Sequence, residues 1–185
     1  MHIHNRYAMI QQEFDDLGEL TEDHLAGSRL LFEENITTPK EFEVWTCLAG
    51  MPLPANITRQ FQKITEIISS LLSKKTRMYK VIPHNYHLEL FIVKRPHEIV
   101  SEDHLIKAKE AFSNVIPTFQ AFEISYKGFL VTKDGVVIVK GFGDFDQLRD
   151  KLRSNLPYAS PAQSNLGHIS LGRILDPWID KDFQN

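Results

Sequence analysis

Apolar positions follow two different periods along this chain, and the changes of period mark its elements. From residue 57 onward apolar side chains recur at helical spacing, which places them on one face of a helix of about five turns. These residues are Ile57, Phe61, Ile64, Ile67, Ile68, Leu71 and Leu72. Runs rich in β-branched and aromatic residues flank this segment, and they predict strands over 42–48, 78–82 and 86–93.

The second half of the chain repeats the order of strand, helix and strand. Its apolar pattern predicts strands over 119–131, 136–140 and 166–174, and a helix over 145–156. Another helix, opened by Ser101, closes the first half. The two halves share the order of their elements but not their residues. We therefore predict an α+β fold built from two β-α-β lobes.

The first 41 residues differ in composition from the rest. They are polar and acidic, and Thr21 followed by acidic residues is typical of a helix start. We interpret 1–41 as a partly helical N-terminal extension and 42–185 as one domain. With 185 residues, 42% of them hydrophobic and 24% charged, the chain is long and apolar enough to bury a core.

Charge and cysteine content narrow the classes of function. The formal net charge of −3 provides no global basic field, so extended binding to duplex nucleic acid is not expected. The single cysteine, Cys47, excludes an intrachain disulfide framework and a cysteine zinc site. No stretch resembles a signal peptide or a membrane span. We expect a cytoplasmic protein that does not bind membranes, with a monomer as the favoured state.

Two predicted strands carry the chemistry. His87-Leu88-Glu89-Leu90 and His168-Ile169-Ser170-Leu171 each set a histidine and a polar residue two positions apart. Side chains at i and i+2 share one face of a strand, so two such strands side by side would bring two imidazoles together. Imidazole serves as a base or an acid near neutral pH, so such a pair suffices for acid/base catalysis without a metal.

These motifs resemble those of the two-histidine (2H) phosphoesterase superfamily, whose members carry two H-x-[T/S]-hydrophobic motifs on strands of two pseudo-symmetric lobes. The resemblance covers residues 42–175. The second motif, His168-Ile169-Ser170-Leu171-Gly172-Arg173, is similar to the H-x-T/S-L-x-R form of the family. The first motif departs from the pattern, because Glu89 stands where the family has Thr or Ser.

The resemblance implies antiparallel sheets facing a central cleft, with helices outside. It also implies a metal-independent phosphodiesterase that acts on a cyclic nucleotide or on the 2′,3′-cyclic phosphate end of an RNA. His87 and His168 would form the acid/base pair, and Ser170 would bind the phosphate. No metal or other cofactor is implied. Which histidine is the base stays open.

Glu89 admits three interpretations. Two like charges about 4 Å apart at an effective dielectric of about 20 repel by roughly 4 kcal/mol, so an ionised Glu89 would oppose a phosphate. It could orient or charge His87, select a substrate that carries a cation, or mark a site that has lost its activity. A second hypothesis is therefore a catalytically silent fold that binds a nucleotide or a protein partner.

Three further residues are candidates for substrate contact. Arg173 is at odd spacing from His168, so on a regular strand it points away from the site, where it would form a salt bridge instead. Phe91 shares the parity of His87 and could stack on a base, although a place in the core is the alternative. Tyr158 lies in the loop before the second motif, where we expect the edge of an active site.

Overall fold

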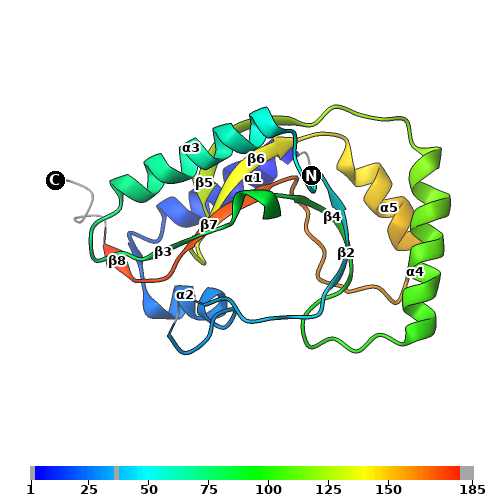
Figure 1. Cartoon of the computed structure of the whole chain (residues 1–185), viewed down its shortest axis with the longest axis horizontal. Coiled ribbons are helices and arrows are strands. Elements are labelled where there is room, and N and C mark those ends of the chain that lie inside the picture. The colour runs from blue at the N-terminus through cyan, green and yellow to red at the C-terminus, as the bar shows by residue number, and fades with distance from the viewer. Residues whose placement is uncertain (1–2, 36–37, 180–185) are drawn as a thin grey trace.

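The computed structural model describes residues 3–35 and 38–179, and its helices pack around an antiparallel sheet (Figure 1). The predicted α+β class is confirmed. The elements in chain order are α1 (Ile3–Asp15), β1 (Glu19–Leu20), α2 (Glu22–Arg29), β2 (Trp45–Ala49), α3 (Ala55–Leu71), β3 (Met78–Lys80), the 3-10 helix η1 (Pro83–Asn85), β4 (Leu88–Lys94), α4 (Glu102–Val115), the 3-10 helix η2 (Ile116–Thr118), β5 (Ser125–Val131), β6 (Val136–Phe142), α5 (Phe145–Asn155), β7 (Ile169–Ile174) and β8 (Trp178–Ile179).

Six of the described strands form the main sheet. Five of them lie in the order β2-β4-β7-β6-β5, and β3 pairs with β7 on the side where β4 also lies. All of these pairs are antiparallel. Strands β4 and β7, both within the described residues, pair only at Leu88 and Ile169, so this contact joins the two parts of the sheet.

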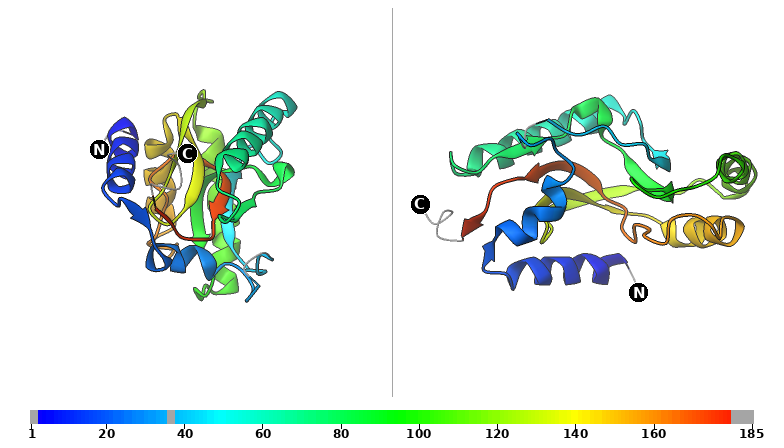
Figure 2. Two further views of the ribbon diagram at one scale, coloured as in Figure 1. Left: turned by 90° about the vertical axis from the view of Figure 1, so that its left-hand side faces the viewer. Right: turned by 90° about the horizontal axis from the view of Figure 1, so that it is seen from below.

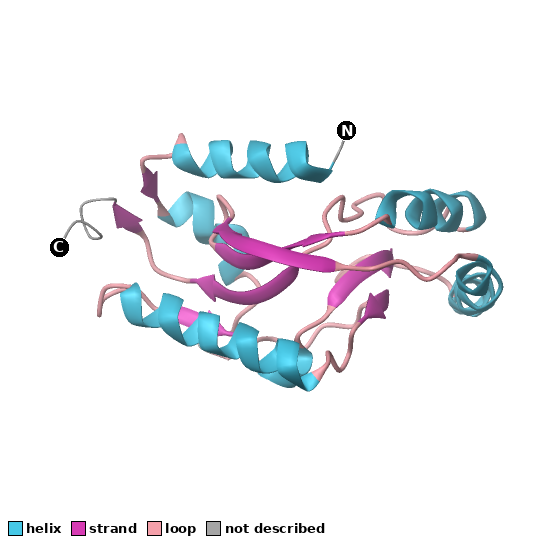
Figure 3. Cartoon of the chain, turned by 90° about the horizontal axis from the view of Figure 1, so that it is seen from above, coloured by secondary structure: helices cyan, strands magenta, loops and turns pink. Residues whose placement is uncertain are grey.

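The helices cover both faces of the sheet (Figure 2, right; Figure 3). Helix α3 packs through Phe61 on the face that carries Leu88 and Ile169. Helix α1 packs through Tyr7 on the opposite face, against Ile138 and its neighbours. Helices α4 and α5 enclose a second cluster around Phe91. No helix among residues 3–35 and 38–179 is long and apolar enough to cross a membrane.

The N-terminal residues are more ordered than a polar extension suggests. Thr21 begins α2 with a capping box to His24, as its sequence signal predicts. The acidic composition did not predict helix α1. Its apolar residues nevertheless stand three or four apart along the chain, which is the spacing of one helix face. These residues are Ile3, Tyr7, Ile10 and Phe14.

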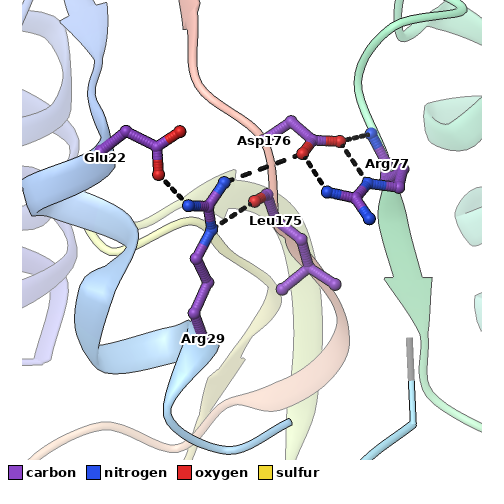
Figure 4. Close-up of polar contacts among 5 residues, drawn as sticks. All are labelled: Glu22, Arg29, Arg77, Leu175 and Asp176. Atoms are coloured by element: carbon purple, nitrogen blue, oxygen red, sulfur yellow. Dashed lines mark hydrogen bonds and ion pairs between the residues drawn. The ribbon is translucent and has the colours of Figure 1, made fainter. Parts of the chain in front are cut away.

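Helix α2 is anchored to the end of β7 by a group of charges (Figure 4). Arg29 at its C-terminus donates from Nε to the Leu175 carbonyl oxygen at 2.7 Å and forms ion pairs with Glu22 and Asp176. Arg77, which precedes β3, donates from Nε and Nη2 to the same Asp176 carboxylate at 2.8 and 2.6 Å. The N-terminal helices are thereby tied to the strand that follows His168.

Gly141 provides a test of the packing that sets the start of β7. A Cβ atom at Gly141 would lie 1.9 Å from the carbonyl oxygen of Gly167, so the two backbones can approach only without a side chain there. We predict that Gly141→Ala lowers the free energy of unfolding by about 1–3 kcal/mol or more, measured by urea denaturation.

The matched control is Gly27→Ala on α2, where a Cβ atom would meet nothing within 4 Å. Alanine is the better helix former, so this variant should be as stable as the wild type or slightly more stable. Equal stability of the two variants would contradict the close approach of Gly141 and Gly167.

Candidate active site

His87 stands one residue before β4 and is held by the turn that precedes it. The η1 turn brings the Asn85 carbonyl oxygen to 2.7 Å from Nδ1 of the half-buried His87 ring. A carbonyl oxygen only accepts, so Nδ1 carries the hydrogen of this bond. Nε2 is therefore the nitrogen of His87 that is left to take or give a proton.

His168 stands one residue before β7, in the same relation to its strand as His87 to β4. The ring is half-buried, and its Nδ1 is a buried atom without a hydrogen-bond partner. Gly167 beside it allows the approach of Gly141 and of the Phe145 ring, which a Cβ atom at Gly167 would meet at 2.1 Å.

The single pairing of β4 with β7 brings the two motifs together. Leu88 faces Ile169, and both side chains are fully buried in the core. Continuing this register by one residue places His87 opposite Ser170 and Glu89 opposite His168. Because side chains alternate along a strand, all four lie on the face opposite that core. Direct neighbours in such pairs have Cβ atoms about 4.5–5.5 Å apart, and diagonal ones roughly 7–8 Å.

Glu89 lies on this face as expected, and its surroundings oppose its charge. Burial raises the pKa of its carboxyl group, while the charges of Arg95, His87 and Arg149 and a hydrogen bond with Thr46 lower it. The carboxylate is thus partly compensated by cations from three different segments. Glu89 therefore repels a bound anion less than the sequence alone suggested.

Phe91 lies in the core, one of the two positions expected from the sequence, and not on the site face. Between β2 and β4 the register shifts, because Leu48 faces Glu89 and Cys47 faces Phe91. This leaves Leu90 as an extra residue, a β-bulge, which turns Phe91 to the other face. Phe91 is 1% exposed and packs among α4 and α5, so the alternative of a core position is the one observed.

A second bulge, in β7, turns Arg173 toward the site face. Gly172 faces Val137 and Ser170 faces Ile138, so Leu171 is the extra residue in β7. Arg173 therefore lies on the same face as Ser170. Regular alternation predicted that it would point away from the site. Its Nη1 donates to the Ser28 hydroxyl of α2 at 2.9 Å. It forms no salt bridge within the described part of the chain.

Tyr158 lies away from the two histidines. Its hydroxyl donates to the carbonyl oxygen of His104 at 2.8 Å, and its ring stacks on the His104 ring with centroids 3.9 Å apart. The loop residue is thus fastened to α4, and the structure does not place it at the edge of the site.

The field around His168 disfavours its protonated form. Burial lowers its pKa to about 4, and the charges of Arg149, Arg173 and His87 act in the same direction, while Asp134 opposes them. The ring is therefore neutral at neutral pH. Because His87 is among these charges, the two imidazoles lie near enough to influence each other.

Arg149 of α5 is the neighbour that sequence reasoning missed. It is 7% exposed and stands on the apolar face of α5 beside Phe145, Leu148 and Leu152. A charged residue on that apolar face was the available signal. Residues 3–35 and 38–179 contain no group of three His, Cys, Asp or Glu side chains arranged to hold a metal.

Comparisons with known proteins do not assign a function to this chain. No model of a protein family and no curated protein matches the chain. Among solved structures, the crystal structure of TT0787 of Thermus thermophilus is similar over 71% of this chain and 78% of that chain. The identity is 18% and the TM-score is 0.46, a likeness too distant to carry any function to this chain.

The lowered pKa of His168 predicts an acid-dependent loss of stability. An unfolded chain binds this proton near pH 6.5, but the folded protein binds it only near pH 4. Falling pH therefore favours the unfolded state between these values, by up to about 3 kcal/mol. Measured by urea denaturation from pH 7 to pH 4, His168→Gln should lose less stability than the wild type. His84→Gln is the control, because it changes an exposed histidine, and it should keep the pH dependence of the wild type. Equal slopes for all three proteins would contradict a His168 ring that stays neutral.

Proposed function

We propose that this chain is a metal-independent phosphodiesterase of the two-histidine type. Its substrate is a cyclic nucleotide or the 2′,3′-cyclic phosphate end of an RNA. The observation that carries the proposal is the pairing of Leu88 with Ile169, which sets His87, Glu89, His168 and Ser170 on one face of two adjacent strands. Two imidazoles in that arrangement can act on the two sides of one phosphorus atom.

The two histidines have different environments and therefore different roles. His168 is neutral above about pH 4, so it is the general base that accepts a proton from the attacking water. Its Nδ1 is buried, which leaves Nε2 for this task. His87, protonated on Nε2, is the general acid. As water forms a bond to phosphorus, the bond to one ribose oxygen breaks and that oxygen takes the proton of His87, which yields a phosphomonoester.

The phosphate is held by groups from β7. The Ser170 hydroxyl donates a hydrogen bond to a phosphoryl oxygen, as negative charge builds there in the transition state. Arg173, brought to the same face by the bulge at Leu171, adds a positive charge. Together with Arg149 it offsets Glu89, so the site has a net attraction for a phosphodiester anion.

Substitution of either histidine tests the reaction. We predict that His87→Gln and His168→Gln each lower kcat on 2′,3′-cyclic nucleotides by about 10²–10⁴-fold, because each removes one proton transfer. The assay is a panel of cyclic mononucleotides, short RNA with a cyclic phosphate end and 2′,5′-linked oligonucleotides, run in excess chelator. His84→Gln should remain fully active.

Loss of turnover in chelator, restored by a divalent ion, would contradict metal-free catalysis. Binding of a nucleotide without turnover by the wild type would favour the silent binding fold instead.

Replacing Glu89 tests how its carboxylate affects the phosphate. Glu89→Thr removes a like charge and restores the hydroxyl of the family pattern, so kcat/KM on a 2′,3′-cyclic nucleotide should rise. A tenfold gain corresponds to about 1.4 kcal/mol of transition-state stabilisation. Glu66→Thr on α3, where Glu66 pairs with Lys80 at the surface, makes the same change of net charge and should have no effect. A fall in kcat/KM with Glu89→Thr would show that Glu89 orients His87 or binds a substrate cation.

A further inference from the structure

Arg149 is a buried cation without an ion pair in the described part of the chain. Its Nε donates to the Leu90 carbonyl oxygen at 2.9 Å, and its Nη2 donates to those of Glu89 and Leu166 at 3.1 and 2.6 Å. Its Nη1 is buried without a partner, and the guanidinium lies 5.2 Å from the centroid of the Phe145 ring. Buried charges are costly without a direct partner, so a guanidinium with no ion pair on an apolar helix face calls for a reason other than stability.

The three carbonyl groups belong to the segments that position the site. Glu89 and Leu90 form the bulge of β4, which separates the face of Glu89 from that of Phe91. Leu166 lies two residues before His168, in the segment that leads into β7. One rigid, planar guanidinium thus spans the two chain segments just where β4 and β7 have stopped pairing.

The charge of Arg149 also reaches the ionisable groups of the site. It lowers the pKa of the Glu89 carboxyl and, as the first charge after burial, the pKa of His168. Arg149 itself is surrounded by Asp146, Arg6, Glu89 and Tyr7, and burial lowers its own pKa. The other charges that act on His168 are those of Arg173, His87 and Asp134.

We propose that Arg149 is a positioning residue of the phosphodiester site. Through the carbonyl groups it fixes Glu89 and His168 relative to each other, and its buried charge balances Glu89 beside an anionic phosphate. This inference rests on the proposed function, because the positive charge of Arg149 contributes to binding only if the substrate is an anion. It explains how the site accommodates a carboxylate where the resembling family has a hydroxyl group.

The test is the titration of the His168 ring by NMR, which does not depend on turnover. Arg149→Gln removes the charge, and the pKa of His168 should rise by about one unit or more, since a nearby like charge disfavours protonation. Arg149→Lys keeps the charge, so the pKa should stay close to the wild-type value. His168→Gln identifies the resonance.

Arg153→Gln is the matched control. Arg153 lies one turn further along α5, donates to the carbonyl oxygens of Ala159 and Ser160, and stands 5.2 Å from the centroid of the Phe91 ring. It therefore shares with Arg149 the bonds to backbone carbonyl groups and the contact with an aromatic ring, but it is half-buried and is not among the charges that shift His168. Its substitution should leave the titration of His168 unchanged.

An unchanged pKa in Arg149→Gln, or an equal rise in Arg153→Gln, would overturn the proposal. If Arg149→Gln does not fold, Arg149→Met takes its place as the uncharged variant: a rise in the pKa of His168 supports the role of the charge, and an unchanged pKa refutes it. A wild type that turns over no phosphodiester, while Arg149→Gln still raises the pKa, would refute the proposed reaction and leave the influence of Arg149 on His168 intact.

Discussion

The pairing of Leu88 with Ile169 is the contact on which the candidate site depends. Within the described residues it is the only ladder pair between β4 and β7, and it alone sets which residues of the two motifs face each other. A slip of one residue would move a whole set of side chains to the other face of the sheet.

Beyond this pair, side chains make the hydrogen bonds to β4 that a longer β7 would make. Arg149 bonds the carbonyl groups of Glu89 and Leu90, and Gln163 pairs with both the N–H and the C=O of Ile92. The backbone groups of β4 are thereby satisfied where β7 has turned away.

Charge gives the site its asymmetry. His168 lies among Arg149, Arg173 and His87, in a buried environment that favours the neutral ring. The charge of His87 acts on the carboxyl group of Glu89, and the hydrogen bond of His87 to Asn85 fixes which of its ring nitrogens is free. Two histidines in equivalent sequence positions thus have different surroundings, set by neighbours that are remote in sequence, and the proposed division into base and acid rests on that difference.

Much of the fold was predictable from local patterns, and the site only in part. The period of apolar residues in α3 and α5, and the capping signal at Thr21, correspond to observed elements. The places of His87, Glu89, His168 and Ser170 follow from regular alternation, which holds around Leu88 and Ile169. Alternation fails at Leu90 and Leu171, where bulges reverse the expected faces of Phe91 and Arg173. Bulges arise from strand pairing, so one strand's own sequence does not reveal them. The roles of Arg149 and Ser28 depend on contacts between distant segments and were invisible for the same reason.

The central claim is that both histidines face one phosphate-binding site. The most direct measurement is an NMR titration with a nucleoside 2′-monophosphate and a nucleoside 3′-monophosphate, the two phosphomonoesters that the proposed reaction can yield, while the ring signals of His87 and His168 are followed together. The account predicts that both rings shift along saturation curves with one common Kd, and that the exposed His84 does not shift. A response of only one of the two rings, or two different dissociation constants, would contradict a shared site.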